Sequence, residues 1–226
     1  MATAKYAAGA AGLNPADYAD MKAVAASSTA MAAVAASSTA MAAIVAAPVA
    51  MAALWRSDTA IKALQANATA WKTFTGASSS VMGKTVAILA GLNPSSYADM
   101  TAIAASSTAM TAVAASSAAT SAIAASTTAL TAIAGSTTAL DALYAKKSRL
   151  TGASASKSGK FIILEISSNS AFDTSQYGYA TLSDGSKPNW QDYKSKYAYF
   201  KHFKKIATYI KNDTEGDDWI DYFPCG

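Results

Sequence analysis

A ten-residue repeat runs through most of the first 150 residues and constrains the fold more than any other feature of the chain. Most copies open on a large side chain, an apolar residue follows three positions later, and a small polar residue stands at the seventh position. The first positions are Met21, Met31, Met41, Met51, Ile61 and Trp71, then Met100, Met110, Thr120, Leu130, Leu140 and Leu150. Spacing this regular is typical of a repeat architecture in which similar units stack on one another.

The stretch of decads is itself duplicated. Residues 12–15 (GLNP) recur as residues 91–94, an offset of 79, and each copy runs into its own series of decads. Gly/Ser-rich segments at 75–80 and 151–156 end the two series and predict turns or linkers. We therefore expect a first decad array over residues 1–80, a second over 81–156, and a separate C-terminal domain over 157–226.

The length of the repeat conflicts with one continuous helix. At about 100° per residue, ten residues fall about 80° short of three full turns, so the apolar pairs would spiral around a straight helix. A supercoil cannot absorb this mismatch, because about 3.3 residues per turn lies far from the helical value of about 3.6. Each decad must therefore contain a break.

The break is predicted at the small polar residue, because serine is a preferred N-cap. The position after it is Pro48 in one decad and Asp58 in another, and both suit a first helical turn. Asn14 and Asn93 also stand directly before a proline. Each unit is expected to hold a cap, about two turns of helix and a tight reversal of the chain.

Helices this short need neighbours, so the decads should stack into a slender solenoid with alanine allowing close approach of the backbones. Two other structures are compatible with an Ala-rich tract but fit this one less well. An ice-binding Ala/Thr helix requires threonine along one face of a continuous helix, which a decad does not align. A disordered low-complexity tract is disfavoured because large apolar residues recur at regular positions.

Charge and composition limit the partners. Charged residues make up 14% of the chain, with a net charge of +4, whereas roughly 25% is usual in soluble domains. No dense basic stripe is present, so we expect no nucleic-acid binding. Ser and Thr interrupt the Ala-rich stretches, which argues against membrane insertion. The N-terminus lacks a signal-peptide pattern, so synthesis in the cytoplasm is expected.

From residue 157 onward alanine becomes rarer, and aromatic and charged residues become more frequent. The segment FIILEI at 161–166 predicts a buried strand, and 176–182 predicts a partner strand that ends in a turn at 183–186. Residues 202–211 favour a strand, 188–200 fit helix or strand, and 219–223 should close a hairpin across 212–216. A small β-sandwich would suit this length. The expected fold class is α+β multidomain: duplicated short-helix, solenoid-like decad repeats followed by a small, mainly β C-terminal domain.

Aromatic residues are the main indication of a binding site in that domain. Tyr and Trp combine a flat apolar face with a polar group, which suits both sugar recognition and protein interfaces. Most of them must be core in a domain this small, with a few left for contacts. The candidate ligand-binding residues are Tyr177, Tyr179, Trp190, Tyr193 and Trp219.

An acidic cluster lies near the C-terminus and comprises Asp213, Glu215, Asp217, Asp218 and Asp221. Its spacing matches no established calcium loop, and a solvated hairpin turn explains it better. The single His202 has no marked nucleophile or orienting acid beside it, and no Gly-x-Ser-x-Gly elbow occurs. Cys225, the only cysteine, is expected to be a free thiol. We therefore predict no enzymatic activity, no metal and no cofactor.

The tract SSTAMAAVAASSTAM, introduced by GLNPxxYxDM, resembles Ala/Ser/Thr decad tracts in tail-fibre and related virion proteins of tailed bacteriophages. The segment from KSGKFIILEIS to DYFPCG is similar to short β-rich terminal modules that follow such tracts. The resemblance implies a virion component that is homo-oligomeric, with a trimer favoured. Its repeats would space or anchor, and its β domain would contact a host-surface glycan, a host protein or another virion subunit. No catalytic residues carry over.

Three functions remain open at this point. The first is a virion fibre protein with a receptor- or partner-binding tip. A head- or tail-decorating virion protein without a receptor role shares every sequence feature with it. A polysaccharide-degrading enzyme that uses the acidic C-terminal cluster belongs to a different class, and cleavage assays on host polysaccharide, with Asp217→Asn and Asp218→Asn as test variants, would separate it from the other two.

Overall fold

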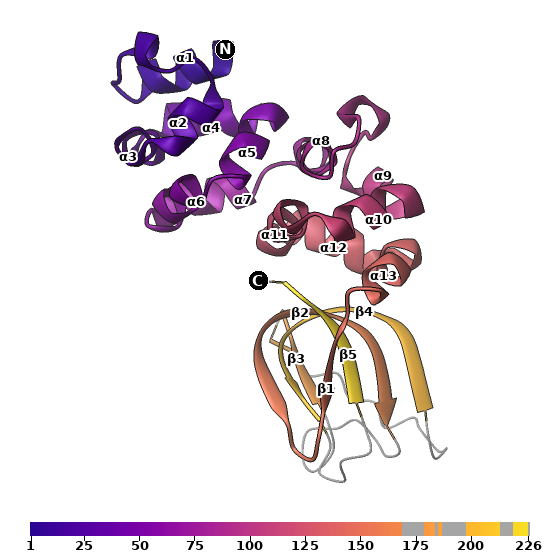
Figure 1. Cartoon of the computed structure of the whole chain (residues 1–226). Helices are drawn as coiled ribbons and strands as arrows, with labels where there is room; N and C mark the ends of the chain where they lie inside the picture. Colours follow the sequence, from indigo (N-terminus) through magenta and orange to yellow (C-terminus); the bar gives the residue numbers. More distant parts are fainter. Residues whose placement is uncertain (169–178, 184, 187–197, 213–218, 226) are drawn as a thin grey trace. The chain divides into compact units, whose positions relative to one another are not determined.

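The computed structural model describes residues 1–168, 179–183, 185–186, 198–212 and 219–225. Within these residues it contains thirteen α-helices, two short 3-10 turns and five β-strands, with every helix preceding every strand (Figure 1). This order confirms the expected α+β class, in which short helical repeats lead into a small antiparallel sheet.

The helices of the first copy are short. They are α1 (Ala2–Ala10), α2 (Met21–Ala26), α3 (Ser28–Ala36), α4 (Ser38–Val45), α5 (Pro48–Trp55), α6 (Asp58–Gln65) and α7 (Ala68–Thr75), with a 3-10 turn at Pro15–Asp17. The second copy has α8 (Ser79–Leu89), α9 (Met100–Ala105), α10 (Ser107–Ala115), α11 (Ser117–Ala125), α12 (Thr127–Gly135) and α13 (Thr137–Tyr144), with a 3-10 turn at Pro94–Ser96. From α2 and α9 onward, the starts of matching helices differ by the sequence offset of 79.

The breaks fall at the predicted cap positions. Ser27, Ser37 and Ser57 each accept a hydrogen bond from the backbone N–H three residues further on, at 3.2 Å, and Asn67 does the same at 3.0 Å. Ala47 cannot cap, but the proline that follows it at the first helical position has no N–H to satisfy.

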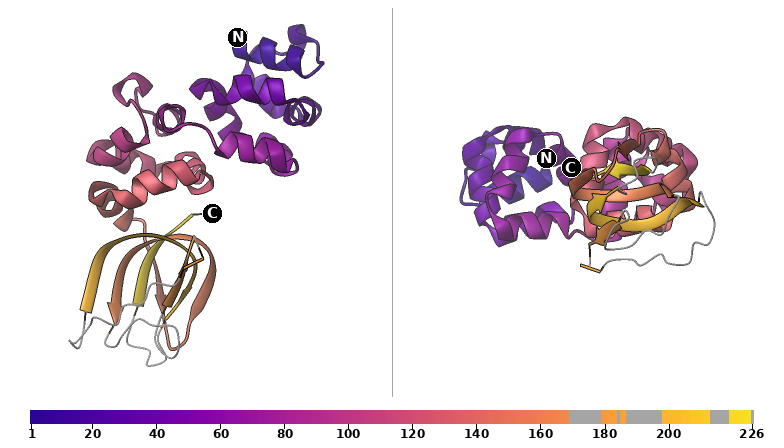
Figure 2. Two further views of the ribbon diagram at one scale, coloured as in Figure 1. Left: turned by 180° about the vertical axis from the view of Figure 1, so that it is seen from behind. Right: turned by 90° about the horizontal axis from the view of Figure 1, so that it is seen from below.

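The expected tight reversal at each break is wrong, because the chain turns a corner instead. The axes of α3 and α4 meet at 99°. Between α3 and α4 only Ser37 leaves the helical conformation, with φ −100° and ψ 108°. One extended residue leaves no loop in which to reverse the chain, so successive helices meet at the sharp corners seen in Figures 1 and 2.

Stacking joins each of the helices α1 to α5 to the third helix after it. The packed pairs are α1 with α4, α2 with α5, α3 with α6, α4 with α7, and α5 with α8. The cap residues also link these layers: Ser57 Oγ donates to the carbonyl of Ala25 at 2.7 Å, and Asn67 Nδ2 donates to that of Ala35 at 3.0 Å. One side chain therefore starts its own helix and closes the end of a helix one layer below.

Met and Val form the seam of the stack, as the spacing indicates. Met31, Val34 and Ile44 have no exposed surface, and Met41 is 2% exposed. Every described helix of the first copy also buries at least one alanine, which lets the backbones approach closely. The core is a succession of small, similar contacts rather than one thick cluster.

The described chain divides into two compact units. The first comprises residues 1–103 and 115–129, and the second comprises 104–114 and 130–226. The second unit therefore joins the last decads to the sheet. Within it, Ser136 Oγ donates to the carbonyl of Ala104 at 2.6 Å, as Ser57 does in the first copy, and α13 packs against the sheet.

The sheet is antiparallel and its strand order is β1-β5-β2-β4-β3. Its strands are β1 (Ser148–Thr151), β2 (Ser156–Ser168), β3 (Tyr179–Leu182), β4 (Ala198–Lys211) and β5 (Trp219–Pro224). The long apolar β2 is central, and a core of Phe161, Ile163, Ile166, Ala180, Leu182, Ala207, Ile210, Ile220 and Tyr222 covers one face. The described strands form this single curved sheet (Figure 1) rather than the two layers of the expected sandwich.

Strands were predicted well and their pairing was not. The predicted strands at 161–166, 202–211 and 219–223 lie within β2, β4 and β5, and β3 covers the end of the one at 176–182. The hairpin expected between 202–211 and 219–223 is wrong, because β2 lies between β4 and β5 and pairs with both. Strand β1 had no predicted counterpart, and the expected turn at 151–156 connects it to β2.

Candidate functional site

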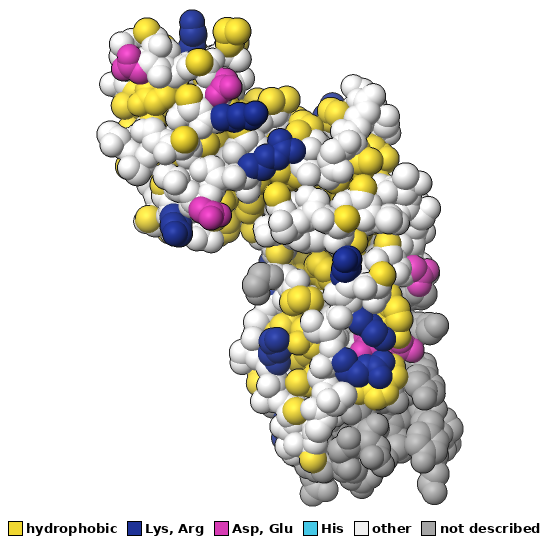
Figure 3. Space-filling model, viewed as in Figure 1, with side chains coloured by type: hydrophobic (Ala, Val, Ile, Leu, Met, Phe, Trp, Pro, Cys, Tyr) yellow, Lys and Arg dark blue, Asp and Glu magenta, His cyan; other side chains and the backbone are white. Residues whose placement is uncertain are grey.

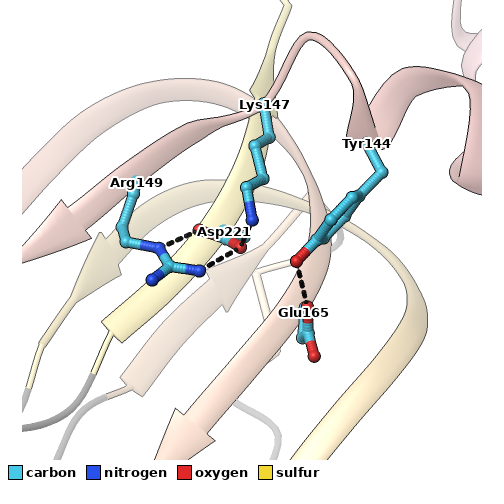
Figure 4. Close-up of polar contacts among 5 residues, drawn as sticks. All are labelled: Tyr144, Lys147, Arg149, Glu165 and Asp221. Atoms are coloured by element: carbon cyan, nitrogen blue, oxygen red, sulfur yellow. Dashed lines mark hydrogen bonds and ion pairs between the residues drawn. The ribbon is translucent and has the colours of Figure 1, made fainter.

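Five polar side chains gather in the second unit where α13 gives way to the sheet (Figure 4). Tyr144 ends α13, Lys147 lies on the connection that follows, and Arg149 lies on β1. Glu165 comes from β2 and Asp221 from β5. We call these five residues the junction cluster, because they join the last helix of the repeat to three strands.

Asp221 is the centre of the junction cluster. Its side chain has no exposed surface, yet it forms ion pairs with two cationic side chains. Arg149 Nε donates to Oδ1 at 2.6 Å and an Nη donates to Oδ2 at 2.8 Å, while Lys147 Nζ also donates to Oδ2. Burial alone would raise the pKa of Asp221, but the hydrogen bonds from Arg149 and Lys147 outweigh it and hold the pKa below its ordinary value.

Glu165 is a second buried carboxylate, only 4% exposed, and it lies directly opposite Asp221 in the pairing of β2 with β5. Tyr144 Oη donates to Glu165 Oε2 at 2.7 Å. That hydrogen bond is the main cause of a raised pKa for Tyr144, because the phenol is needed as a donor.

A β-bulge explains how Glu165 reaches this face. The register of β2 shifts between Ile163 and Glu165 against both neighbouring strands. Against β5 the extra residue is Leu164 of β2, whereas against β4 the extra residues lie on β4. Ile163 and Ile166 can therefore both face the sheet core although they are three residues apart. Glu165, between them and opposite Asp221, is directed to the face where α13 ends (Figure 4).

Cations stack on aromatic rings around the junction cluster. The Arg149 guanidinium lies 3.6 Å from the centroid of the Trp219 ring, and Lys147 Nζ lies 3.8 Å from that of Tyr144. Stacking of this kind covers apolar surface and adds a modest attraction. Trp219 is thus half-buried and partly covered by Arg149.

Of the five predicted ligand-binding residues, Trp219 is the one whose side chain the structure describes. Tyr179 begins β3, an edge strand, and its side chain lies outside the described set. Tyr177, Trp190 and Tyr193 fall outside the described residues. The described residues therefore do not bring these five together into one site, and they place Trp219 beside the junction cluster instead.

The solvated turn expected for the acidic cluster is wrong for Asp221, which is buried and ion-paired in a strand. The other four acids of that cluster fall outside the described residues. In the described ranges no group of three or more His, Cys, Asp or Glu side chains is placed to hold a metal ion. Cys225 is free and buried, and burial raises the pKa of its thiol to about 12.

The chemistry of the junction cluster suits attachment better than catalysis. Two carboxylates face two cations, so its charges balance, and each carboxylate accepts a hydrogen bond from a side chain on the helix-to-β1 segment. A general acid or base instead needs a pKa near the working pH and access to a substrate proton. Fixed, balanced ion pairs hold elements together.

Sequence reasoning missed the junction cluster, although the residues carry a faint indication of it. Lys147 and Arg149 stand two positions apart at the start of the short strand β1, and Asp221 lies between Ile220 and Tyr222 in an alternating strand. Alternation places Lys147 and Arg149 on one side of the chain. Their common partner lies more than 70 residues away, and a sequence pattern alone does not identify such a partner.

The surface of the first unit is weakly charged. Figure 3 shows isolated Lys, Arg, Asp and Glu side chains over the helices on the face in view, and a tighter group of both signs over the sheet. A shallow groove of about 180 Å³ is lined by Met1, Thr3, Ala4, Asp20, Met21, Lys22, Val49, Ala50, Ala53, Arg56 and Ile88. Arg56 is engaged there, because it donates to the carbonyl of Ile88 at 2.8 Å.

Among the described residues, no single helix is both long and apolar enough to cross a membrane. Two pairs, α3 with α4 and α10 with α11, meet the length and composition criteria only when joined across their sharp corners. Comparison of the chain with protein-family models and with curated proteins finds no match to either. The fold and the contacts of the chain itself therefore carry the functional argument.

Proposed function

We propose that this chain is a structural, non-enzymatic protein whose stacked decads act as a spacer or anchor and whose C-terminal sheet contacts a partner. The observation that carries the proposal is the layered stack, in which the cap side chains of Ser37, Ser57 and Asn67 also donate to a carbonyl of a helix in the layer below. Such a stack lengthens by adding near-identical units, and it presents mainly Ala, Ser and Thr to solvent. Those properties suit a spacer.

The setting we propose is the virion of a tailed bacteriophage, with assembly into a homo-oligomer, a trimer being favoured. Support comes from the resemblance of the decad tract and its GLNP lead-in to tracts in tail-fibre and related virion proteins. Other virion subunits would hold the repeats, and the sheet would face a host-surface glycan or protein. Trp219 is the described aromatic residue best placed to contribute to such a contact.

Mass spectrometry of purified phage particles tests this setting. We expect peptides from both decad arrays, at a copy number per particle that is a multiple of the number of subunits in the oligomer. We also expect an antibody to the chain to label the particle surface. Absence from particles, combined with a monomer in analytical ultracentrifugation, would exclude the virion proposal.

A decorating role without receptor binding is the second candidate. The observation that favours it is the stacking of Arg149 on Trp219, which leaves less of that ring free for a ligand. Adsorption of the purified chain to host cells separates the two. Binding that Trp219→Ala weakens supports a receptor-binding tip, whereas particle association without cell binding supports decoration.

A further inference from the structure

Strands β2 and β5 carry a conflict that these two strands do not resolve by themselves. Glu165 and Asp221 are directly opposite each other on adjacent strands, and both are buried. Like charges in this arrangement repel each other, and carboxylates removed from water need compensating partners. Strands β2 and β5 therefore bring together two groups that disfavour their pairing.

The compensation comes from the end of the helical repeat. Tyr144, the last residue of α13, donates to Glu165, and Lys147, three residues later, donates to Asp221. Arg149 then binds Asp221 from β1, its register partner on β5. All three donors lie within six residues of one another, on the segment that leads from the helix into the sheet.

Apolar packing also connects α13 to the sheet. Helix α13 packs against β4 and β5, and its Leu140 and Leu143 are buried. Ile162, which alternates with the core residues Phe161 and Ile163, has no exposed surface either. Both faces of β2 are therefore covered, and the face opposite the core cluster is the one on which the junction cluster lies.

We propose that the junction cluster makes α13 and the sheet one cooperative folding unit, in which the docked end of the last repeat helix is required for β2 and β5 to pair. The last decad then has two roles. It ends the helical stack, and it supplies contacts that β2 and β5 require in order to pair. The sheet is held to the repeat by directional hydrogen bonds to two buried carboxylates instead of a flexible linker. The sheet would be coupled to α13 in this way whichever partner it binds.

Hydrogen–deuterium exchange of the full chain, followed by peptide, tests the coupling. Lys147→Met removes the cation that the connection after α13 brings to Asp221, and Lys146→Met, at the exposed neighbouring lysine, is the matched control. We expect exchange in α13 and in β5 to rise together, about tenfold in K147M, with K146M like the native chain. Faster exchange in the sheet with unchanged exchange in α13 would overturn the proposal.

A second variant separates this coupling from simple loss of a contact. Glu165→Gln removes one of the two opposed charges but still accepts a hydrogen bond from Tyr144. The double variant K147M/E165Q should therefore regain most of the protection lost in K147M, and no regain would show that the opposed acids are not what α13 offsets. If K147M leaves the sheet unfolded, loss of protection in α13 supports the proposal and retention of it overturns the proposal.

Discussion

The helical repeat and the sheet are both built from short elements, and they are stabilised in different ways. In the repeat, successive helices make similar contacts, an apolar seam and, at Ser57 and Asn67, a side chain that caps one helix and donates to another, so stability is spread over many similar units. In the sheet, one face is an ordinary apolar core, while the other depends on a single buried polar cluster. We therefore expect the loss of one contact to have a more local effect in the repeat than in the sheet.

The difference follows from how far apart in sequence the partners lie. The linking hydrogen bonds of the repeat join residues about 30 positions apart and recur, whereas Arg149 and Asp221 are 72 positions apart and their contact occurs once. Substitutions in the repeat should therefore have local effects of moderate size. Substitutions in the junction cluster should affect several elements together.

The largest effect is expected from removing both cations of the junction cluster. In Lys147→Met/Arg149→Met the fully buried Asp221 loses its compensation, and we expect the second unit to lose about 3–5 kcal/mol of unfolding free energy. Urea unfolding monitored by exchange in sheet peptides measures this, with K146M as control. A loss below that of a typical surface substitution would show that the ion pairs contribute little.

The same double variant should also change the pH dependence of stability. In the native chain the pKa of Asp221 lies below its ordinary value of 3.8, so its contribution is present above that value and is lost as the pH falls through the folded pKa. Without the cations, burial should raise that pKa, so the variant loses stability as the pH rises. The stability difference between the two proteins should therefore be larger at neutral pH than near pH 3. An equal difference at both would contradict this account.

Core truncation in the repeat should be the next largest effect, and it should stay local. Met41→Ala leaves a cavity where a 2% exposed side chain stood in α4, and we expect a loss of about 2–4 kcal/mol in the first unit. Exchange should rise in α4 and in its stacking partners α1 and α7, and remain unchanged in the sheet. Ala42→Ser, at the exposed next position, is the control.

The fold of the repeat could be derived from its sequence because local rules suffice there. The misfit of ten residues with the helical period requires a break, and Ser27, Ser37 and Ser57 mark where it falls. The corner of about 100° could not be derived, since nothing in a decad shows whether one extended residue or a loop joins two helices. The donation from Ser57 to Ala25 was equally hidden, because it depends on which layers meet.

The sheet was harder to predict from the sequence than the repeat, and the candidate site was the hardest to predict. Individual strands follow from alternation and β-branched residues, as at 161–166. Strand order does not, because the sequence neighbours β4 and β5 are separated by β2. An acid in a polar, Gly-containing C-terminal segment is typical of a solvated turn, and only tertiary structure shows that Asp221 is buried between two cations.

Removing one linking serine should have a smaller effect than a core cavity. Ser37→Ala deletes both the cap of α4 and the donor to the carbonyl of Ala10, at 2.9 Å, so we expect a loss of about 1–2 kcal/mol. The adjacent, exposed Ser38→Ala is a matched control that keeps the cap and should change stability by less than about 0.5 kcal/mol. Thermal unfolding by circular dichroism compares them, and equal losses would refute the double role of Ser37.

The smallest effect on stability should come from the aromatic ring that borders the junction cluster. Trp219→Ala removes the surface on which the Arg149 guanidinium stacks at 3.6 Å, but it leaves the hydrogen bonds from Arg149 to Asp221 in place. We expect a loss of about 1 kcal/mol, since half-exposed cation–aromatic contacts are weak. Trp219→Phe should restore part of it, because a ring remains for stacking. If W219A destabilised the second unit as strongly as the loss of both cations, the ring and not the ion pairs would hold the repeat to the sheet, and the contrast between the two regions would need a different physical basis.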